Sequence, residues 1–445
     1  MENNVSLTLK SRKKWTSDGT SRIQPVKVTL ENVIPMINKI GISRIANITD
    51  LDRLKIPNYS AVLPGTEDYI WVYGGKGPTK NHAKASAIME SIERFSSLPK
   101  NYPYKLIRGS YGELSKSYNV LKYDDVIEPL SFSLDDKMIM DYCMGFDLLN
   151  EKSILVPAPL VIFKYVPKPP SVNPYAFYHT NGLASGNVIE EAICHAFCEV
   201  IERDSTSISE FVSSAFQFHI LRTIENSFIQ YGINLNNIDS RKFIDDNTIF
   251  SDVIMSDIAN RYCQNLLKRF ETCQIPLIVK DITSDLGIPT FIASSVEWIN
   301  HDYGYLVEGQ GTHPDSRIAL IRSITEVSQS RAANIQGSRD DLRKIKYNLD
   351  DSDDKRSWQF IKSTKQIKFS EVRSFYNDDI LDDVKLILSK LKEKGLEKAI
   401  IVNLTNPTLG IPVVRAIVPG LETFKVNKSI VGTRAKESFK KCLNL

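Results

Sequence analysis

Hydrophobic and polar positions follow two different periods along the chain. Short runs of apolar and β-branched residues predict strands, whereas longer stretches with apolar residues three and four positions apart predict helices. The predicted strands are 276–282, 290–296, 399–404 and 411–418, and the predicted helices are 81–96, 188–205, 257–271, 315–334 and 378–394. Because strands and helices alternate, we expect an α/β fold built of layers.

The first polar stripe lies on the predicted helix 81–96. Ser86, Glu90 and Glu93 share one side of this helix, because about 100° of rotation separates consecutive residues. Arg94 follows them and completes a Glu-x-x-Glu-Arg motif, which recurs at 199–203. One such motif alone is typical of a solvated helix face with paired charges. The presence of two copies favours a functional site over a solvated face.

The second copy lies on a helix that is apolar around most of its circumference. One of its faces carries five polar or thiol side chains, with Glu199 beside them: Asn187, Glu191, His195, Cys198 and Glu202. Carboxylates on such a helix are expected to reach a buried or half-buried site. The approximate similarity of 83–97 to 192–206 indicates two related helices across a pseudo-symmetric site.

Converging carboxylates would need a cation to remain ionised at neutral pH. Mg²⁺ is the natural candidate, since it binds carboxylate oxygens and keeps positions for phosphate oxygens. A zinc site at Cys194, His195 and Cys198 is the alternative, but no fourth ligand stands near them in the sequence. Small buried cysteines are the more common case.

A third helix repeats the spacing of the first stripe with Arg322, Glu326 and Gln329. The segment 309–315 precedes it with two glycines, and we expect a flexible glycine turn there. A helix N-terminus that follows such a turn can receive an anion. His313 is expected either to take part in this site or only to cap the helix.

These motifs, taken together, resemble the YcaO family of ATP-dependent enzymes that modify peptide backbones. The resemblance rests on segments 84–94, 180–204 and 309–339 and on the stretch Gly-Ile-Pro-Val-Val-Arg-Ala-Ile-Val-Pro-Gly-Leu-Glu at 410–422, in the family's order. It extends from about Gly19 to the end of the chain. It implies a YcaO-type layered fold with mixed sheets, in which carboxylate-bearing helices surround a Mg-ATP site.

The resemblance also implies roles for individual residues. Ser86 would contact the nucleotide, Arg203 would bind phosphate oxygens and act in catalysis with Glu191, and the metal ions would be held by Glu90, Glu93, Glu191, Glu199 and Glu202. Asn187 would complete this shell, and the other side of the nucleotide would be closed by Arg322, Glu326 and Gln329.

The remaining basic residues have two readings each. Arg94 would bind the nucleotide, or else pair with a structural carboxylate. Lys13, Lys14 and Arg22 lie in a basic stretch that would fold over the phosphates, or else be a solvated run of charge.

In the chemistry that the family implies, a nucleophile adds to an amide carbonyl and the oxyanion takes the γ-phosphoryl group of ATP before phosphate leaves. Positioning and charge neutralisation would supply most of the catalysis. Family members that form azolines commonly end in a proline-rich tail, whereas the printed sequence ends Ser-Phe-Lys-Lys-Cys-Leu-Asn-Leu. We therefore expect the branch that uses external sulfide, which converts a peptide amide into a thioamide (thioglycine).

The expected partners follow from that branch. They are a TfuA-like protein, a sulfide donor and a peptide or protein substrate, of which the α subunit of methyl-coenzyme M reductase is the archaeal example; a homodimer is the family expectation. Two other functions stay open: an azoline-forming cyclodehydratase, and a non-catalytic accessory protein that binds nucleotide.

Composition limits the remaining possibilities. A formal net charge of +3 is too small to indicate a nucleic-acid or membrane partner, and the longest apolar run, 154–163, is broken by two prolines. Six cysteines without disulfide spacing favour a reducing, cytoplasmic setting. We expect 1–58 to form a basic and helical part of the core, 59–445 to form the catalytic domain, and 347–356 to be an acidic surface connector.

Overall fold

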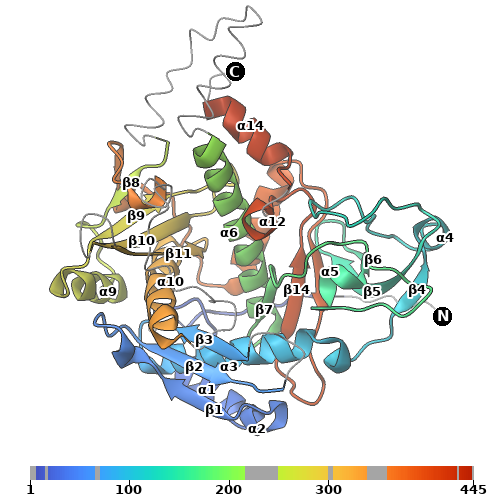
Figure 1. The fold of residues 1–445 in the computed structure, drawn as a ribbon, viewed down its shortest axis with the longest axis horizontal. Helices are drawn as coiled ribbons and strands as arrows, with labels where there is room; N and C mark the ends of the chain where they lie inside the picture. Colours follow the sequence, from blue (N-terminus) through green and yellow to red (C-terminus); the bar gives the residue numbers. More distant parts are fainter. Residues whose placement is uncertain are drawn as a thin grey trace, which may run out of the picture. The chain divides into compact units, whose positions relative to one another are not determined.

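The computed structural model describes residues 7–15, 19–65, 71–215, 249–298, 304–337, 358–427 and 430–442. The chain divides into two compact units. The first unit comprises Met1–Ile201, Arg331–Ile345 and Phe375–Leu421, and the second comprises Glu202–Ser330, Lys346–Ser374 and Glu422–Leu445. Helix α6 (Ile189–Ala215) contributes residues to both units (Figure 1).

The first unit contains two antiparallel sheets. The smaller has the order β1-β2-β3, and the larger has the order β4-β5-β13-β14-β7, with β6 paired to β5. Their strands are β1 (Arg44–Asn47), β2 (Asn58–Val62), β3 (Val72–Lys76), β4 (Ile107–Ser110), β5 (Ile139–Asp147), β6 (Lys152–Pro157), β7 (Leu183–Ser185), β13 (Ile400–Asn403) and β14 (Val413–Ile417).

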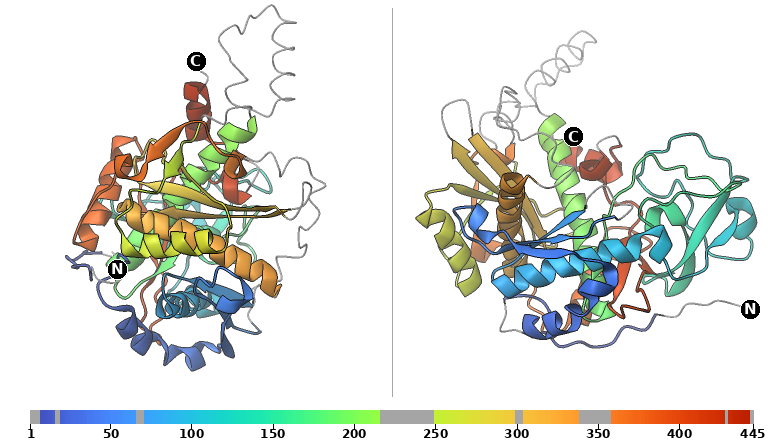
Figure 2. Two further views of the ribbon diagram at one scale, coloured as in Figure 1. Left: turned by 90° about the vertical axis from the view of Figure 1, so that its left-hand side faces the viewer. Right: turned by 60° about the horizontal axis from the view of Figure 1, so that its bottom comes forward.

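Helices cover these sheets. They are α1 (Val26–Val33), α2 (Met36–Ile40), α3 (Lys80–Ser97), α4 (Tyr111–Leu114), α5 (Ala158–Val161) and α12 (Ile380–Glu393), with short 3-10 turns η2 (Thr49–Leu51) and η3 (Pro99–Asn101). Helix α3 lies along the three-stranded sheet (Figure 2) and also contacts β7 and β14. It therefore brings its side chains to the edge of the larger sheet.

The second unit is built on one five-stranded sheet in the order β11-β10-β9-β8-β12. Only the β8–β12 pair is parallel among these described strands. The elements are β8 (Asp252–Ile254), β9 (Leu277–Asp281), β10 (Thr290–Trp298), β11 (Gly304–Thr312), β12 (Gln366–Lys368), α9 (Arg261–Thr272), α10 (Ser316–Gln336), α13 (Phe424–Asn427), α14 (Thr433–Cys442), η4 (Trp358–Phe360) and η5 (Phe369–Glu371).

The predicted helices and strands are present. Most of their ends shift by a few residues, and the helix expected at 188–205 continues to Ala215. The helix expected at 257–271 begins later, at Arg261, because the side chain of Asn260 accepts hydrogen bonds from the backbone N–H groups of Tyr262 and Cys263 and caps it. The acidic connector 347–356 lies outside the described residues. No helix in the described part of the chain is long and apolar enough to span a membrane.

The domain boundary expected at residue 58 coincides with the start of β2, and the sheet joins β1 and β3 on either side of it. The two units described above have different limits. The proposed separation of 1–58 from 59–445 therefore stays a prediction.

Each unit contains the same succession of a helix, three antiparallel strands and a second helix. In the first unit the succession is α2, β1, β2, β3 and α3, and in the second it is α9, β9, β10, β11 and α10. A residue with positive φ follows each opening helix, Gly41 directly after α2 and Gln274 two residues after the end of α9. We call these two successions the first and the second repeat.

The two repeats share one close contact between strand and helix. A Cβ atom on Gly75 of β3 would lie 2.2 Å from both Ala83 O and Ala87 N of α3. A Cβ atom on Gly311 of β11 would lie 2.1 Å from Ala319 O and 2.6 Å from Ser323 N of α10, at the same sequence separations. Only glycine permits this approach, so the helix position relative to its strand is equivalent in the two repeats.

Candidate functional site

Helix α3 begins at a capped end, and its polar stripe lies beside a face of small residues. Thr79 Oγ1 accepts a hydrogen bond from His82 N, which satisfies an N–H group of the first turn. Ala83 and Ala87 are fully buried against the strand, where a larger side chain would separate helix from sheet. Ser86, Glu90 and Glu93 are only partly buried, as expected for a functional stripe.

Glu93 is held by strand β7. Ser185 donates to Glu93 Oε1 from its backbone N–H at 2.8 Å and from its hydroxyl at 2.7 Å. Although part of the side chain is accessible, removal of the carboxyl group from bulk water, together with the charges of Glu90 and Glu199, raises its pKa to about 8 against the opposing hydrogen bonds from Ser185.

These three carboxylates fit a divalent cation. The pKa of Glu93 is raised first by burial and further by the charges of Glu90 and Glu199, so its charged form is unfavourable there unless a positive charge joins them. Oxygen ligands from carboxylates are those that Mg²⁺ binds. The first unit therefore brings together Glu90, Glu93 and Glu199, and their role as metal ligands stays a prediction.

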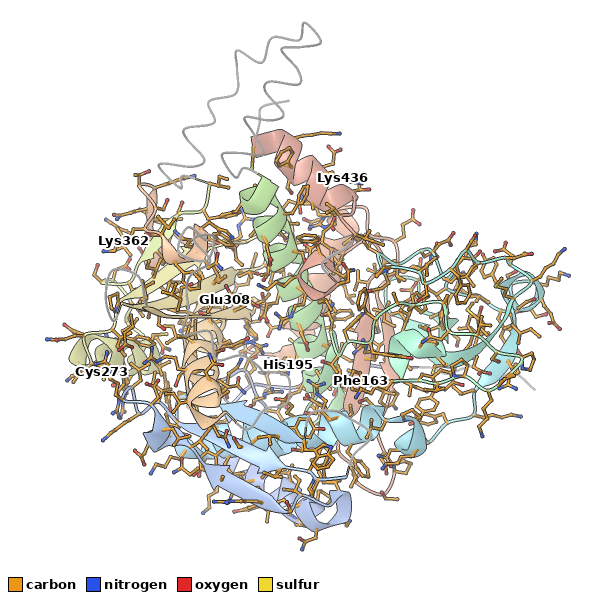
Figure 3. The ribbon with its side chains drawn as sticks, viewed as in Figure 1. Phe163, His195, Cys273, Glu308, Lys362 and Lys436 are labelled. Atoms are coloured by element: carbon orange, nitrogen blue, oxygen red, sulfur yellow. The ribbon has the colours of Figure 1, made fainter. Side chains whose placement is uncertain are left out.

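Arg94 is engaged within the first unit. Its Nη2 atom lies 3.5 Å from Glu90 Oε1, and its guanidinium lies over the rings of Tyr73 and Phe163, with the carbon centre 5.9 Å and 5.7 Å from the two ring centroids. Phe163 is labelled in Figure 3. The expected pairing with a carboxylate is present. Arg94 also limits the repulsion that Glu90 exerts on its neighbours.

Glu191 and Asn187 bind the N-terminal segment. Glu191 accepts hydrogen bonds from Ile23 N at 2.7 Å, from Arg22 Nη1 at 3.3 Å and from the backbone and side-chain amides of Asn187, both at 2.9 Å. Asn187 Oδ1 in turn accepts from Gln24 Nε2 at 2.9 Å. These contacts fix the start of α6, and the predicted metal and catalytic roles of Glu191 stay predictions.

The basic N-terminal residues pair with carboxylates of the same unit. Lys13 Nζ lies 3.2 Å from Asp378 Oδ1, and both side chains are largely exposed. Lys14 pairs with the buried carboxylate of Asp383. The predicted contact of Lys13 and Arg22 with phosphates stays a prediction.

In the second unit, two predicted site residues lie close to Glu202. Its side chain is buried, and Glu202 Oε2 accepts a hydrogen bond from Thr312 N at 3.0 Å at the end of β11. Arg203 Nη2 lies 3.5 Å from Glu202 Oε1, and Arg322 Nη2 lies 3.9 Å from Glu202 Oε2. Arg203 Nη1 also donates to Gln310 Oε1 at 2.5 Å. The second unit thus gathers two arginines around one buried carboxylate.

The stripe on α10 occupies positions equivalent to the stripe on α3. Counted from the glycine contacts of the two repeats, Arg322, Glu326 and Gln329 correspond to Ser86, Glu90 and Glu93. All three α10 residues are partly buried. The structural repeat therefore makes α3 and α10 equivalent helices. The sequence alone shows only that their polar residues have the same spacing.

The glycine turn expected before α10 is wrong. Gly309 and Gly311 lie in β11, a regular strand that pairs with β10 along its whole length. Their role is to let α10 approach the sheet, since a Cβ on Gly309 would lie 2.5 Å from Ser323 O and from Val327 N. His313 follows the strand and its Nδ1 accepts a hydrogen bond from Asp315 N at 2.9 Å, so it holds the turn into the helix.

Sequence reasoning missed a buried charged group in the first unit. Arg415, in β14, is 3% exposed and donates to His179 Nδ1 at 3.1 Å and to His179 O at 2.9 Å. His179 Nε2 lies 3.0 Å from Glu128 Oε1. The available signal was one arginine within an otherwise apolar strand, Val-Val-Arg-Ala-Ile.

Comparison with known proteins agrees with this geometry. Residues 74–422 match the model of the family described as YcaO cyclodehydratase, ATP- and Mg²⁺-binding. A protein of unknown function from Methanothermobacter thermautotrophicus is 32% identical over 92% of this chain and 97% of its own length. Another, from the tfuA 3′ region of Rhizobium leguminosarum bv. trifolii, is 28% identical over 93% of this chain and 91% of its own.

Solved structures show the same fold at lower identity. A heterocyclase in complex with substrate and cofactor superposes with a TM-score of 0.73 at 20% identity, covering 94% of this chain and 55% of that one. YcaO from Methanopyrus kandleri, bound with AMPPCP and Mg²⁺, gives 0.70 at 20% identity and covers 95% of this chain and 98% of that one. By the extent of the family match and the identity to its relatives, the chain belongs to the YcaO family, and its cofactors are ATP and Mg²⁺.

Proposed function

We propose that the protein uses ATP to convert a backbone amide of a peptide into a thioamide, with sulfide as the external nucleophile. The ATP-dependent activation of an amide oxygen is supported by membership of the YcaO family. Sulfide as the nucleophile is supported by one observation: a relative that aligns over nearly the whole of both chains is encoded beside tfuA. A TfuA-like protein is accordingly the proposed partner.

Within the first unit we assign Mg²⁺ binding to the carboxylates Glu90, Glu93 and Glu199, and within the second unit, taken by itself, to Glu202. The raised pKa of Glu93 supports this assignment, because a cation would favour its ionised form. Mg²⁺, when bound there, would neutralise phosphate charge. We also assign Glu191 to the metal ligands. In this structure its oxygens accept hydrogen bonds from the N-terminal segment and Asn187.

The nucleotide is assigned to the polar stripes and the arginines. Arg203 and Arg322 supply guanidinium donors for phosphate oxygens, and both lie within 4 Å of Glu202. The remaining nucleotide contacts are assigned to Ser86, Asn187, Glu326 and Gln329, and to Arg94, Lys13 and Arg22 where these leave their present carboxylate partners.

The proposed reaction balances without any oxidant. Hydrosulfide adds to the carbonyl carbon, and the electron pair of the C=O bond moves to oxygen. That oxygen forms a bond to the γ-phosphorus of ATP while the bond to ADP breaks. The C–O bond then breaks, phosphate leaves with the former carbonyl oxygen, and the proton of hydrosulfide passes to phosphate. The residues bind, orient and neutralise charge rather than form covalent bonds.

Mass spectrometry tests this proposal. The protein would be incubated with ATP, Mg²⁺, sulfide and a glycine-containing peptide from the α subunit of methyl-coenzyme M reductase, with and without a TfuA-like protein. A sulfide-dependent increase in peptide mass, from replacement of oxygen by sulfur, is the expected result. Loss of water from a peptide that contains cysteine, serine or threonine, without need for sulfide, would identify the second candidate, a cyclodehydratase, which the family description favours.

A further inference from the structure

Arg415 is a buried charged residue of the first unit that the proposed nucleotide and metal assignments do not use. Its pKa is lowered to about 10, chiefly by burial, so it is still charged at neutral pH. A fully buried guanidinium normally pairs with a carboxylate through two parallel hydrogen bonds. Here its hydrogen bonds go to His179, and its Nε atom has no partner among the described residues.

His179 and Glu128 fix the orientation of this arginine. A guanidinium can only donate, so His179 Nδ1 must accept the hydrogen bond from Arg415 Nη2. The proton of the neutral imidazole then lies on Nε2, which donates to Glu128 Oε1 at 3.0 Å. Glu128 is 8% exposed and the His179 side chain 15%, so these contacts are largely shielded from water. Such a fixed donor needs no rearrangement when it meets an anion.

Strand register places Arg415 on the side of the sheet that faces the carboxylates. In the antiparallel pair of β7 and β14, Arg415 is opposite Leu183 and Val413 is opposite Ser185. Opposed residues point to the same face, and so do residues two apart on one strand. Arg415 and Ser185 therefore share a face, and Ser185 binds Glu93. The charge of Glu199 also acts on Arg415 and favours its charged form.

The residues that orient Arg415 come from a surface suited to a peptide. Segments 129–131 and 174–176 are joined by two backbone hydrogen bonds, Ser131 N to Pro174 O at 2.7 Å and Ala176 N to Pro129 O at 2.9 Å. The first segment directly follows Glu128, and the second ends three residues before His179. Next to them are exposed apolar side chains: Leu130, Phe132, Phe177 and Tyr178. Exposed aromatic groups on extended backbone are typical of peptide recognition rather than of phosphate binding.

We propose that Arg415 is a catalytic residue that donates hydrogen bonds to the carbonyl oxygen of the peptide amide and to the oxyanion formed from it, and that His179 and Glu128 are its positioning residues. This inference rests on the proposed function. The free donor of Arg415 stabilises the negative charge that appears on oxygen when the nucleophile adds, before that oxygen reaches the γ-phosphorus. The chemical class of its ligand is thus a peptide amide, and its role is distinct from that of Arg203 and Arg322.

The test compares Arg415→Lys with the unaltered protein and with Arg108→Lys, a matched arginine of the same sheet whose Nε binds Asp141 at 2.8 Å. Product from the methyl-coenzyme M reductase peptide, sulfide and ATP would be followed by mass spectrometry, and the Kd of AMPPCP with Mg²⁺ by calorimetry. We expect Arg415→Lys to lower kcat by about 10²–10³-fold, the usual effect of losing one oxyanion donor. Its AMPPCP affinity and the Arg108→Lys activity should stay unchanged.

The outcomes separate the inference from the proposed function. Absence of product from the unaltered protein rejects the proposed function and this inference with it. Normal turnover by Arg415→Lys, in a protein that makes product, rejects the inference alone. A matching loss of AMPPCP affinity would overturn it too, by assigning Arg415 to the nucleotide phosphates.

A second measurement uses the unaltered protein, in case Arg415→Lys does not fold. In protein labelled with ¹⁵N-arginine, the Nε–H resonance of Arg415 should move when the peptide is added to the AMPPCP–Mg²⁺ complex and not when AMPPCP and Mg²⁺ are added alone. A shift with nucleotide alone, or no shift with a peptide that is turned over, would overturn the inference.

Discussion

The first and second repeats share a backbone arrangement but differ in the charge of their helices. In both, a glycine of the third strand touches the backbone of the following helix at equivalent positions. The first repeat then carries Ser86, Glu90 and Glu93, whereas the second carries Arg322, Glu326 and Gln329. The first repeat thus carries an acidic stripe, and the second carries a mixed stripe that includes a guanidinium group. The strand glycines are constrained by close packing, whereas the side chains of the neighbouring stripe differ between the two repeats.

The surroundings of the two stripes differ accordingly. On the first helix, burial and, to a smaller extent, the charges of Glu90 and Glu199 raise the pKa of Glu93 to about 8. On the second, the position of Glu93 is taken by an uncharged glutamine, and Arg322 lies 3.9 Å from the buried Glu202. We infer that the first stripe is suited to a cation and the second to an anion.

The largest expected effect is on stability, from changing the glycines that contact the helix backbone in each repeat. Gly75→Ala and Gly311→Ala should each lower the melting temperature strongly or prevent folding, because the new Cβ atom would lie about 2 Å from helix backbone, which cannot move aside like a side chain. Thermal unfolding followed by circular dichroism measures this. Gly65→Ala is the control, since φ is +71° there but no atom lies within 4 Å. A mild and equal effect at all three glycines would contradict the shared packing.

The next effect separates the two stripes by function. Glu93→Gln copies the residue of the second repeat onto the first and should reduce Mg²⁺-dependent ATP turnover by about 10–100-fold, since a contact to a charged group contributes ~1.5–3 kcal/mol. Gln329→Ala should cost less than about tenfold, as an uncharged hydrogen bond contributes ~0.5–1.5 kcal/mol. ATP hydrolysis measured over a Mg²⁺ series tests both. Equal losses would show that the two stripes do not differ in metal binding.

A pH dependence should distinguish the repeats next. The pKa of Glu93 is raised in the folded protein, so between its usual value near 4.5 and about 8 the folded state binds a proton that the unfolded state does not. Stability without Mg²⁺ should therefore fall as pH rises through this window. Urea unfolding at several pH values would show it. Glu93→Gln should remove this contribution to the slope, while Gln329→Ala should leave it.

The smallest expected effect compares Arg322 with its equivalent, Ser86. Arg322→Gln should raise the KM for ATP by about tenfold or more, because it removes a charged donor, whereas Ser86→Ala should change it only a few-fold. Steady-state kinetics with varied ATP measures the difference. If Ser86→Ala had the larger effect, the nucleotide would be held chiefly by the first repeat.

Much of the site was accessible from local pattern. The spacing of Glu90 and Glu93, of Glu199 and Glu202, and of Arg322 and Glu326 follows from helical periodicity, and the helices form where this periodicity predicts them. The glycines of 309–311 were assigned to a turn because local pattern shows that glycine is permissive without showing why. Their contact with α10 reveals a packing reason instead.

The sequence by itself determined the helices, their polar stripes and membership of the YcaO family, because each depends on neighbouring residues or on motifs in a fixed order. Only the tertiary structure decided that Ser185 binds Glu93, that α3 and α10 occupy equivalent positions, and that Arg415 meets His179 and Glu128. Those contacts join residues far apart in the chain. Their hydrogen bonds and charges act over a few ångströms of space, which no local spacing along the sequence encodes.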